Sequence, residues 1–297
     1  MLDVTSASEV GLPESPPVTR GKSHRGARRT AKRSRSERLR ALGRQTLLAA
    51  VTFGVLALIW ELLSNADPGF WPEIILSKPS EITPAFFEAI TTRFVWENYW
   101  VTFQATILGF VLGAAAGFIL GLMIALIPVF SEAFYPVVIL FQSTPRVALA
   151  PVFIAWFGFG MSSKVALAAT ICFFPVLVNT ITGLSHIDEN AMLLMRSLKA
   201  SRWQIFTHLR WFAALPTIFA GLKAALTFAL IGVIVGELKA TNEGAGFLIE
   251  RGSFQLRMDD VFAYLGILAL FGLLLYGIAN AVERRVVFWQ AGDAEHD

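Results

Sequence analysis

The chain has 297 residues, of which 55% are hydrophobic and 16% are charged, with a formal net charge of +3 and a mean hydropathy of +0.59. This composition is typical of an integral membrane protein and excludes an ordinary soluble globular domain. Because Cys172 is the single cysteine, an intrachain disulfide is excluded as well.

Residues 1–44 form a compositional unit of their own. They are rich in Ser, Pro and Arg and contain eleven basic but four acidic residues. Low hydrophobicity with high net charge predicts a disordered tail, and its basic charge predicts that it lies on anionic headgroups at the cytoplasmic face. Nucleic-acid binding is not favoured, because no aromatic residues are interleaved that could stack on bases.

Six apolar blocks follow, each long enough to cross a bilayer, which needs about 20 mainly apolar residues. They are residues 45–63, 100–127, 134–157, 164–184, 212–238 and 261–282. We therefore predict an all-α, polytopic membrane bundle of about six transmembrane helices. A cleaved signal peptide is the competing interpretation of the first block, but its charged leader and its apolar segment are both long, which favours a retained helix.

Basic residues are distributed unevenly between the two sides of this bundle. One side holds 17 of them, in the tail, in the loop 185–211 and after the last block, and the other side holds six, which are Lys78, Arg93, Lys164, Lys239, Arg251 and Arg257. The positive-inside rule predicts that both termini and the loop are cytoplasmic. The domains are then the tail 1–44, a first helix with a periplasmic segment 45–98, a core 99–289 and a C-terminal tail 290–297.

The second block carries a glycine at every fourth position, namely Gly109, Gly113, Gly117 and Gly121. Small residues at this spacing let another helix approach closely, which drives helix association in lipid. A contact inside the bundle is the favoured interpretation, ahead of a dimer seam or a surface that lines a solute path.

The third block is interrupted by Pro136, Pro145 and Pro151. Irregular backbone at membrane depth is tolerated only where protein buries it or where water fills a cavity. Arg146 stands at this break, so we expect either a role on a solute pathway or an ion pair with Glu237. Lys223 is expected to extend its ammonium group to the interface. The candidate pathway residues are Gln142, Thr144, Arg146, Asn179 and Glu237, although an Asn within a span, such as Asn179, more often makes a helix–helix contact.

The loop between the fourth and fifth blocks contains its own helix signal. Ser201 followed three residues later by Gln204 is a capping-box pattern, which predicts that a short helix begins near Ser201. Trp203, Phe206 and Arg210 then fall along one face of that helix.

This loop resembles the cytoplasmic EAA loop of permease subunits of bacterial ABC importers, which docks into the ATPase. The alignment rests on Ala200-Ser201-Arg202-Trp203-Gln204-Ile205-Phe206 and on Ala214-Leu215-Pro216. The segment RVALAPVFIAWFGFGMSSKVALAATICFFPVLVNTITGL supports it, being similar to permeases of the nitrate/sulfonate/taurine and pyrimidine-precursor group. The resemblance covers about residues 99–289 and implies a type I importer fold. The implied ATPase-docking residues are Arg196, Lys199, Ala200, Ser201, Arg202, Trp203, Gln204 and Phe206.

The loop departs from the family pattern at three places. Leu193-Leu194-Met195 replace the Glu-Ala-Ala, Trp211-Phe212 replace the Leu-Pro, and Lys199 replaces a glycine. The glycine marks a turn between two short helices, so Lys199 must adopt the left-handed conformation, at about 1 kcal/mol, or let the first helix continue. We expect the turn to survive, with Trp203 and Phe206 as apolar anchors and Arg196, Arg202 and Arg210 as a charged rim.

The resemblance implies a multi-pass inner-membrane permease that works with a cytoplasmic ATPase dimer, a periplasmic or lipoprotein solute-binding protein and a second permease copy. The chain shows no metal-ligand spacing and no catalytic cluster. Gly21-Lys22-Ser23 resembles the end of a phosphate-binding loop, but Pro16 replaces its first glycine, so ATP and Mg are expected on the ATPase alone. A permease for another solute class, a gated channel or a membrane-embedded enzyme are the alternatives. The sequence does not distinguish an anion from a pyrimidine precursor as solute.

Overall fold

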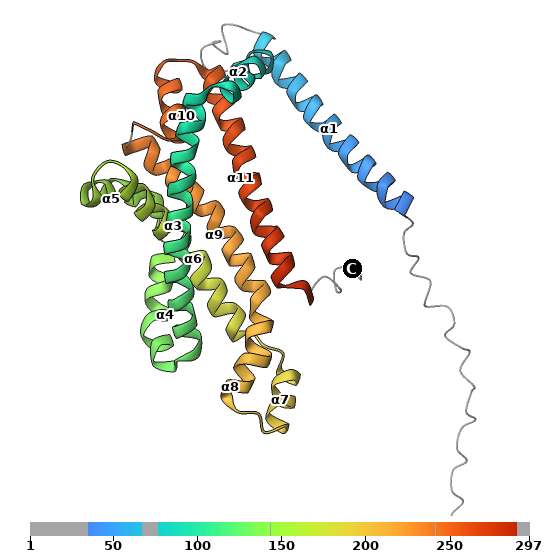
Figure 1. Cartoon of the computed structure of the whole chain (residues 1–297), viewed down its shortest axis with the longest axis vertical. Helices are drawn as coiled ribbons and strands as arrows, with labels where there is room; N and C mark the ends of the chain where they lie inside the picture. Colours follow the sequence, from blue (N-terminus) through green and yellow to red (C-terminus); the bar gives the residue numbers. More distant parts are fainter. Residues whose placement is uncertain (1–34, 67–76, 143, 241, 290–297) are drawn as a thin grey trace, which may run out of the picture. The chain divides into compact units, whose positions relative to one another are not determined.

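A computed structural model describes residues 35–66, 77–142, 144–240 and 242–289, and these residues are almost entirely helical, with no strand among them (Figure 1). The elements are α1 (Arg35–Ala66), α2 (Pro79–Thr91), α3 (Arg93–Leu126), α4 (Pro128–Gln142), η1 (Arg146–Leu149), α5 (Ala150–Phe157), α6 (Met161–Ser185), α7 (Glu189–Ser197), α8 (Arg202–Ile205), η2 (Phe206–Arg210), α9 (Trp211–Ala240), α10 (Ala245–Phe254) and α11 (Met258–Val286). The chain divides after Leu56 into two units, and the helices from α2 onward belong to the second.

The predicted all-α bundle is confirmed, and most of the predicted spans correspond to long helices. Within the described residues, four helices are long and apolar enough to cross a membrane: α3, α6, α11 and the stretch Arg202–Lys239 that ends in α9. The third predicted block is not one straight helix, because α4 and the η1–α5 segment are bent by 88°, an arrangement found in broken spans and in re-entrant loops. The first predicted block lies within α1, whose apolar part, Ala50–Asn65, is shorter than the others.

Helix α1 begins earlier than the sequence interpretation allowed. It starts at Arg35, so residues 35–44 are helical, and the prediction of disorder was wrong for these ten residues. Four Arg and two Leu, both strong helix formers, stand among these ten residues, and an apolar helix follows directly, so helix propagation costs little there. Residues 1–34 lie outside the described part of the chain.

The centre of the second unit is α6, which packs between α3 and α9. Gly109, Gly113, Gly117 and Gly121 all face α6, and a Cβ atom on Gly109 would stand only 2.5 Å from the Cβ of Ala168. The small residues therefore let the two backbones approach, as transmembrane helix packing requires. The predicted contact inside the bundle is confirmed.

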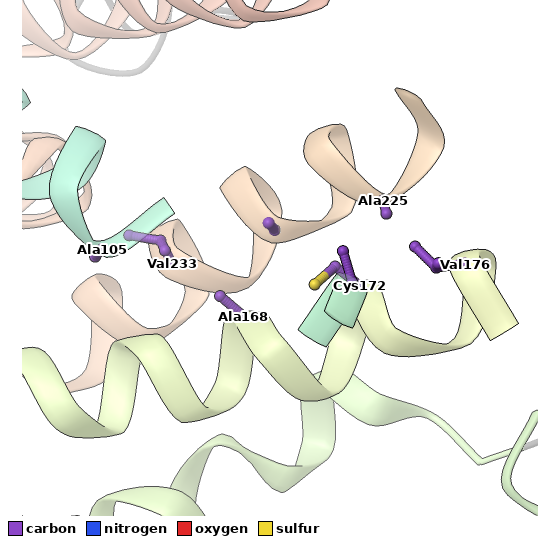
Figure 2. Packing of buried hydrophobic residues seen from close by; sticks show 8 residues of the cluster. Ala105, Ala168, Cys172, Val176, Ala225 and Val233 are labelled. Carbon is purple, nitrogen blue, oxygen red and sulfur yellow. The ribbon is translucent and has the colours of Figure 1, made fainter. Parts of the chain in front are cut away.

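Helix α9 presents a second strip of small residues to the other side of α6, which the sequence analysis missed. At Gly232 a Cβ atom would lie 2.8 Å from the Cα of Ala168, and at Gly221 it would lie 2.5 Å from the Cβ of Asn179. Figure 2 shows the resulting core, in which Cys172 lies among small apolar side chains of α3, α6 and α9. A buried thiol in these surroundings has a packing role.

Candidate functional site

The loop between α6 and α9 consists of two short helices with a sharp turn between them. Helix α7 ends with the amide of Lys199 donating to the carbonyl of Arg196 (2.9 Å) and the amide of Ala200 donating to that of Met195 (3.0 Å). These two bonds form a Schellman motif, and Lys199 occupies its left-handed position with φ of 53°. The turn expected in place of the family glycine is confirmed.

The predicted capping box of α8 is confirmed in both directions. The amide of Gln204 donates to Oγ of Ser201 (3.3 Å), and the amide of Ser201 donates to Oε1 of Gln204 (2.8 Å). Helix α8 continues without interruption into a π-helical turn, η2, and then into α9. The loop is thus a direct extension of a membrane-spanning helix, and a force applied to α8 would reach α9 through continuous helix.

The two aromatic side chains of the loop have different surroundings. Trp203 is 71% exposed and stacks on Phe206, with ring centroids 5.8 Å apart. Phe206 is half-buried and packs against the cluster of Leu184, Ala214 and Ile218. The expectation that both aromatics are exposed anchors was therefore wrong for Phe206, because the π-helical turn carries it beneath the bundle. The other loop residues assigned to docking are exposed, except for the half-buried Ala200.

Glu237 is fully buried, and its carboxylate meets Lys164, not Arg146. Nζ of Lys164, which is also 0% exposed, lies 3.4 Å from Oε1 of Glu237 and donates to the backbone carbonyl of Glu243 (3.0 Å). The expected Arg146–Glu237 pair was therefore wrong. A buried charge requires a partner, and α6 brings this lysine to α9 from 73 residues away in sequence.

The same carboxylate belongs to a buried polar network that holds the start of α10. The amide of Gly246 donates to Glu237 (2.9 Å), that of Ala245 to Oγ1 of Thr102 (2.8 Å) and that of Gly244 to Oδ1 of Asn98 (2.7 Å). Oγ1 of Thr102 donates in turn to Glu237 (2.9 Å). These acceptors satisfy amides that a helix start leaves without partners, and the carboxylate complements the helix dipole. The network gives Glu237 a structural position rather than a place on an open path.

Arg146 and Lys223 each contact a side chain of another helix. The guanidinium of Arg146 lies over the ring of Phe174, 4.3 Å from its centroid, and Nη2 donates weakly to the carbonyl of Gln142 at 3.4 Å. Nζ of Lys223 forms an ion pair with Glu283, in the last turn of α11, at 2.6 Å. Arg146 and Gln142 do lie together at the break between α4 and η1, where Thr144 donates to the carbonyl of Leu140.

Asn179 lies at a helix–helix contact. Its Nδ2 donates to the carbonyl of Pro175 in its own helix (2.8 Å), and its Cβ fills the space left by Gly221 of α9. The structure therefore favours the helix-contact interpretation that the sequence left open.

A cavity of about 490 Å³ opens between the end of α3, helix α4 and the end of α6. Gln142 lines it together with polar residues that the sequence analysis missed, and these are Ser131, Tyr135, Thr182, Ser185 and His186. The rest of its lining is apolar and includes Val138, Ile139 and Ile181. A small number of polar groups in an apolar concave surface is typical of a site for a small organic molecule. Local patterns could not find this cavity, because its lining comes from three helices.

Comparison with known proteins agrees with this arrangement. The family described as binding-protein-dependent transport system inner membrane component matches residues 113–288. The chain is 35% identical over 261 residues to the riboflavin transport system permease protein of Chloroflexus aurantiacus, covering 86% of this chain and 96% of the relative. It is 30% identical over 250 residues to the formylaminopyrimidine transport permease protein of Halalkalibacterium halodurans, covering 83% of this chain and 97% of the relative. It is 26% identical over 251 residues to the taurine transport system permease protein of Escherichia coli, covering 84% of this chain and 91% of the relative.

Two solved transporters share the fold. An inward-facing structure of the MetNI methionine ABC transporter matches with a TM-score of 0.52 and 19% identity, covering 65% of this chain and 94% of that chain. An amino acid ABC transporter with histidines matches with a TM-score of 0.51 and 16% identity, covering 69% and 96%. At these identities the likeness establishes the fold alone, and it confirms the predicted importer-permease architecture.

Proposed function

We infer the role of this chain from one premise: it belongs to the family of binding-protein-dependent transport system inner membrane components. It is a permease subunit of an ABC importer in the inner membrane. We propose that two copies form the pore, that a separate ATPase dimer holds ATP and Mg, and that a solute-binding protein delivers the solute. This chain then binds no cofactor, and its termini face the cytoplasm.

One observation carries the coupling part of this proposal. The two-helix loop presents Trp203 to solvent at the tip of a capped helix that continues into α9. An exposed tryptophan on a locally ordered helix is typical of an energetic anchor in a protein interface. Movement of the ATPases during their cycle would displace α8 and tilt α9, which shifts the bundle between inward- and outward-facing states.

We propose an uncharged polar heterocycle as the solute class. Lys164 and Lys223 each pair with a carboxylate, so neither contributes free positive charge that would favour an anion, and Arg146 lies over Phe174 and is not part of the cavity lining. Among the described residues, no Lys, Arg, Asp or Glu lines the cavity that contains Gln142. Its hydroxyl, amide and imidazole groups can hydrogen-bond a heterocycle, and the permeases named for riboflavin and formylaminopyrimidine are among the relatives.

Reconstitution of the permease with its ATPase and binding protein in proteoliposomes tests the proposal. The melting temperature of the binding protein identifies the solute beforehand, with flavins, pyrimidine precursors, taurine and nitrate as the panel. We expect uptake of a heterocycle that requires ATP inside and binding protein outside. Uptake that proceeds equally well without ATP would indicate a channel, and a shift with taurine or nitrate alone would overturn the solute class.

A further inference from the structure

Three arginines from three parts of the loop line one pocket. Arg196 of α7, Arg202 of α8 and Arg210 of η2 surround a space of about 370 Å³, which we call the arginine pocket. The remaining lining is apolar and comes from Leu126, Met192, Ile205 and Phe206. Arg196 and Arg202 are exposed and Arg210 is half-buried, so all three arginines are at least partly accessible to solvent.

The arginine pocket has no internal counter-charge. No Asp or Glu lines it, and none of the three arginines takes part in the ion pairs found among the described residues. Like charges gathered around one pocket repel each other, and an incoming anion relieves that repulsion. Guanidinium groups offer paired N–H donors that match a carboxylate, so the pocket is suited to bind one.

The neighbouring residues indicate which partner brings the carboxylate. Trp203 is exposed and stacks on Phe206, which lines the arginine pocket, so a partner that buries the indole also comes within reach of the pocket. Leu193 and Leu194, 59% and 60% exposed, add apolar surface on α7. By the resemblance, Leu193 stands where the EAA loop carries a glutamate, so this loop has no acid at that position.

We propose that the arginine pocket receives an acidic side chain of the cooperating ATPase, and that this charge pairing selects which ATPase the permease accepts. The inference rests on the proposed function, since it assigns a partner to the same docking loop. An ATPase with a basic residue at the facing position is rejected, because like charges would be brought together at the interface. Arginine-dependent attraction also steers the encounter, so association depends on salt.

The test measures the affinity of the purified full-length permease for its ATPase across a range of salt concentrations. We expect Arg196→Gln with Arg202→Gln to weaken binding at least tenfold and to flatten the salt dependence. Arg202→Glu should weaken it further, and Arg202→Lys should retain part of the affinity. Arg284→Gln with Arg285→Gln, at the end of α11, is the matched control and should change neither quantity. Unfolding temperatures verify that the variants are folded.

Two results would overturn the proposal. Affinity and salt dependence that are unchanged in the double variant would show that the arginines do not contact the ATPase. If the same variant instead loses retained anionic phospholipid in nanodiscs that contain phosphatidylglycerol, the occupant is a lipid headgroup. If the unaltered permease does not bind the ATPase, the docking function itself is wrong. If it binds normally and the arginine variants bind equally well, only the assignment of the arginine pocket is wrong.

Discussion

The two ends of α9 each lead to a short helical segment, and the two segments are held in opposite ways. Helix α10 is held by side chains of other helices, with Asn98, Thr102 and Glu237 accepting the amides of its N-cap residue and of its first two residues. The α7–α8 loop is held by its own residues, through the capping box of Ser201 and the turn at Lys199. One segment is part of the bundle, and the other is ordered locally but remains exposed.

Because of this difference, mutations in the two segments should affect different properties of the protein. A change in the buried network removes a partner from a charge that water cannot reach, so it should lower the stability of the bundle. A change in the exposed loop alters a surface that solvent still covers, so it should affect association with a partner and leave the fold intact. Four substitutions test this contrast, in order of decreasing expected effect.

Glu237→Gln should have the largest effect, because it leaves the ammonium group of Lys164 buried without its counter-charge. We expect a loss of about 3–5 kcal/mol, visible as poor expression and a lower unfolding temperature in detergent. Glu97→Gln is the matched control, since it breaks the exposed Arg93–Glu97 pair and should cost at most about 1 kcal/mol. Adding Lys164→Gln to Glu237→Gln should restore expression, and equal stability of the two single variants would contradict the buried-pair interpretation.

Trp203→Ala should weaken binding of the ATPase by about 2 kcal/mol, roughly thirtyfold, because the indole is the exposed anchor of the loop. The unfolding temperature of the permease should not change. Phe206→Ala is the informative comparison, since this half-buried ring packs against Leu184 and its loss should lower stability by about 1–2 kcal/mol. If Trp203→Ala keeps full ATPase affinity and coupled uptake, the docking assignment fails.

Gly244→Ala tests the turn that enters α10. Gly244 has φ of 116°, and a Cβ atom there would overlap the carboxylate of Glu237. We expect a loss of about 1–3 kcal/mol, measured by thermal unfolding. Gly277→Ala in α11, with nothing within 4 Å of the added atom, should be neutral or should gain up to about 1 kcal/mol. Similar effects of both changes would show that the turn does not depend on the network.

Lys199→Gly should have the smallest effect and the opposite sign. Glycine adopts the left-handed conformation without the steric penalty that Lys199 carries, so the turn should gain up to about 1 kcal/mol. Slower amide hydrogen exchange in α7 and α8 would report the gain. Lys199→Ala is the control and should show none, because alanine keeps the Cβ atom. Equal protection in both variants would show that the lysine side chain, not the backbone, governs the turn.

Sequence patterns anticipated the features that depend on neighbouring residues. The spacing of Ser201 and Gln204 contains the whole capping box, and the apolar blocks contain the length and hydropathy that make a spanning helix. The glycine strip of α3 was visible because its period is that of a helix face. The strip on α9 was missed, since its glycines are unevenly spaced and become a surface only when α6 lies against them.

The amino-acid sequence by itself therefore determined the helices, the caps, the membrane class and the family pattern, because each depends on residues within a few turns of one another or on composition. Only the tertiary structure decided the partners of the buried charges, since Lys164 and Glu237 are 73 residues apart and meet through the packing of α6 on α9. It also decided that Phe206 is covered while Trp203 is exposed, because the π-helical turn determines which side of the loop faces the bundle.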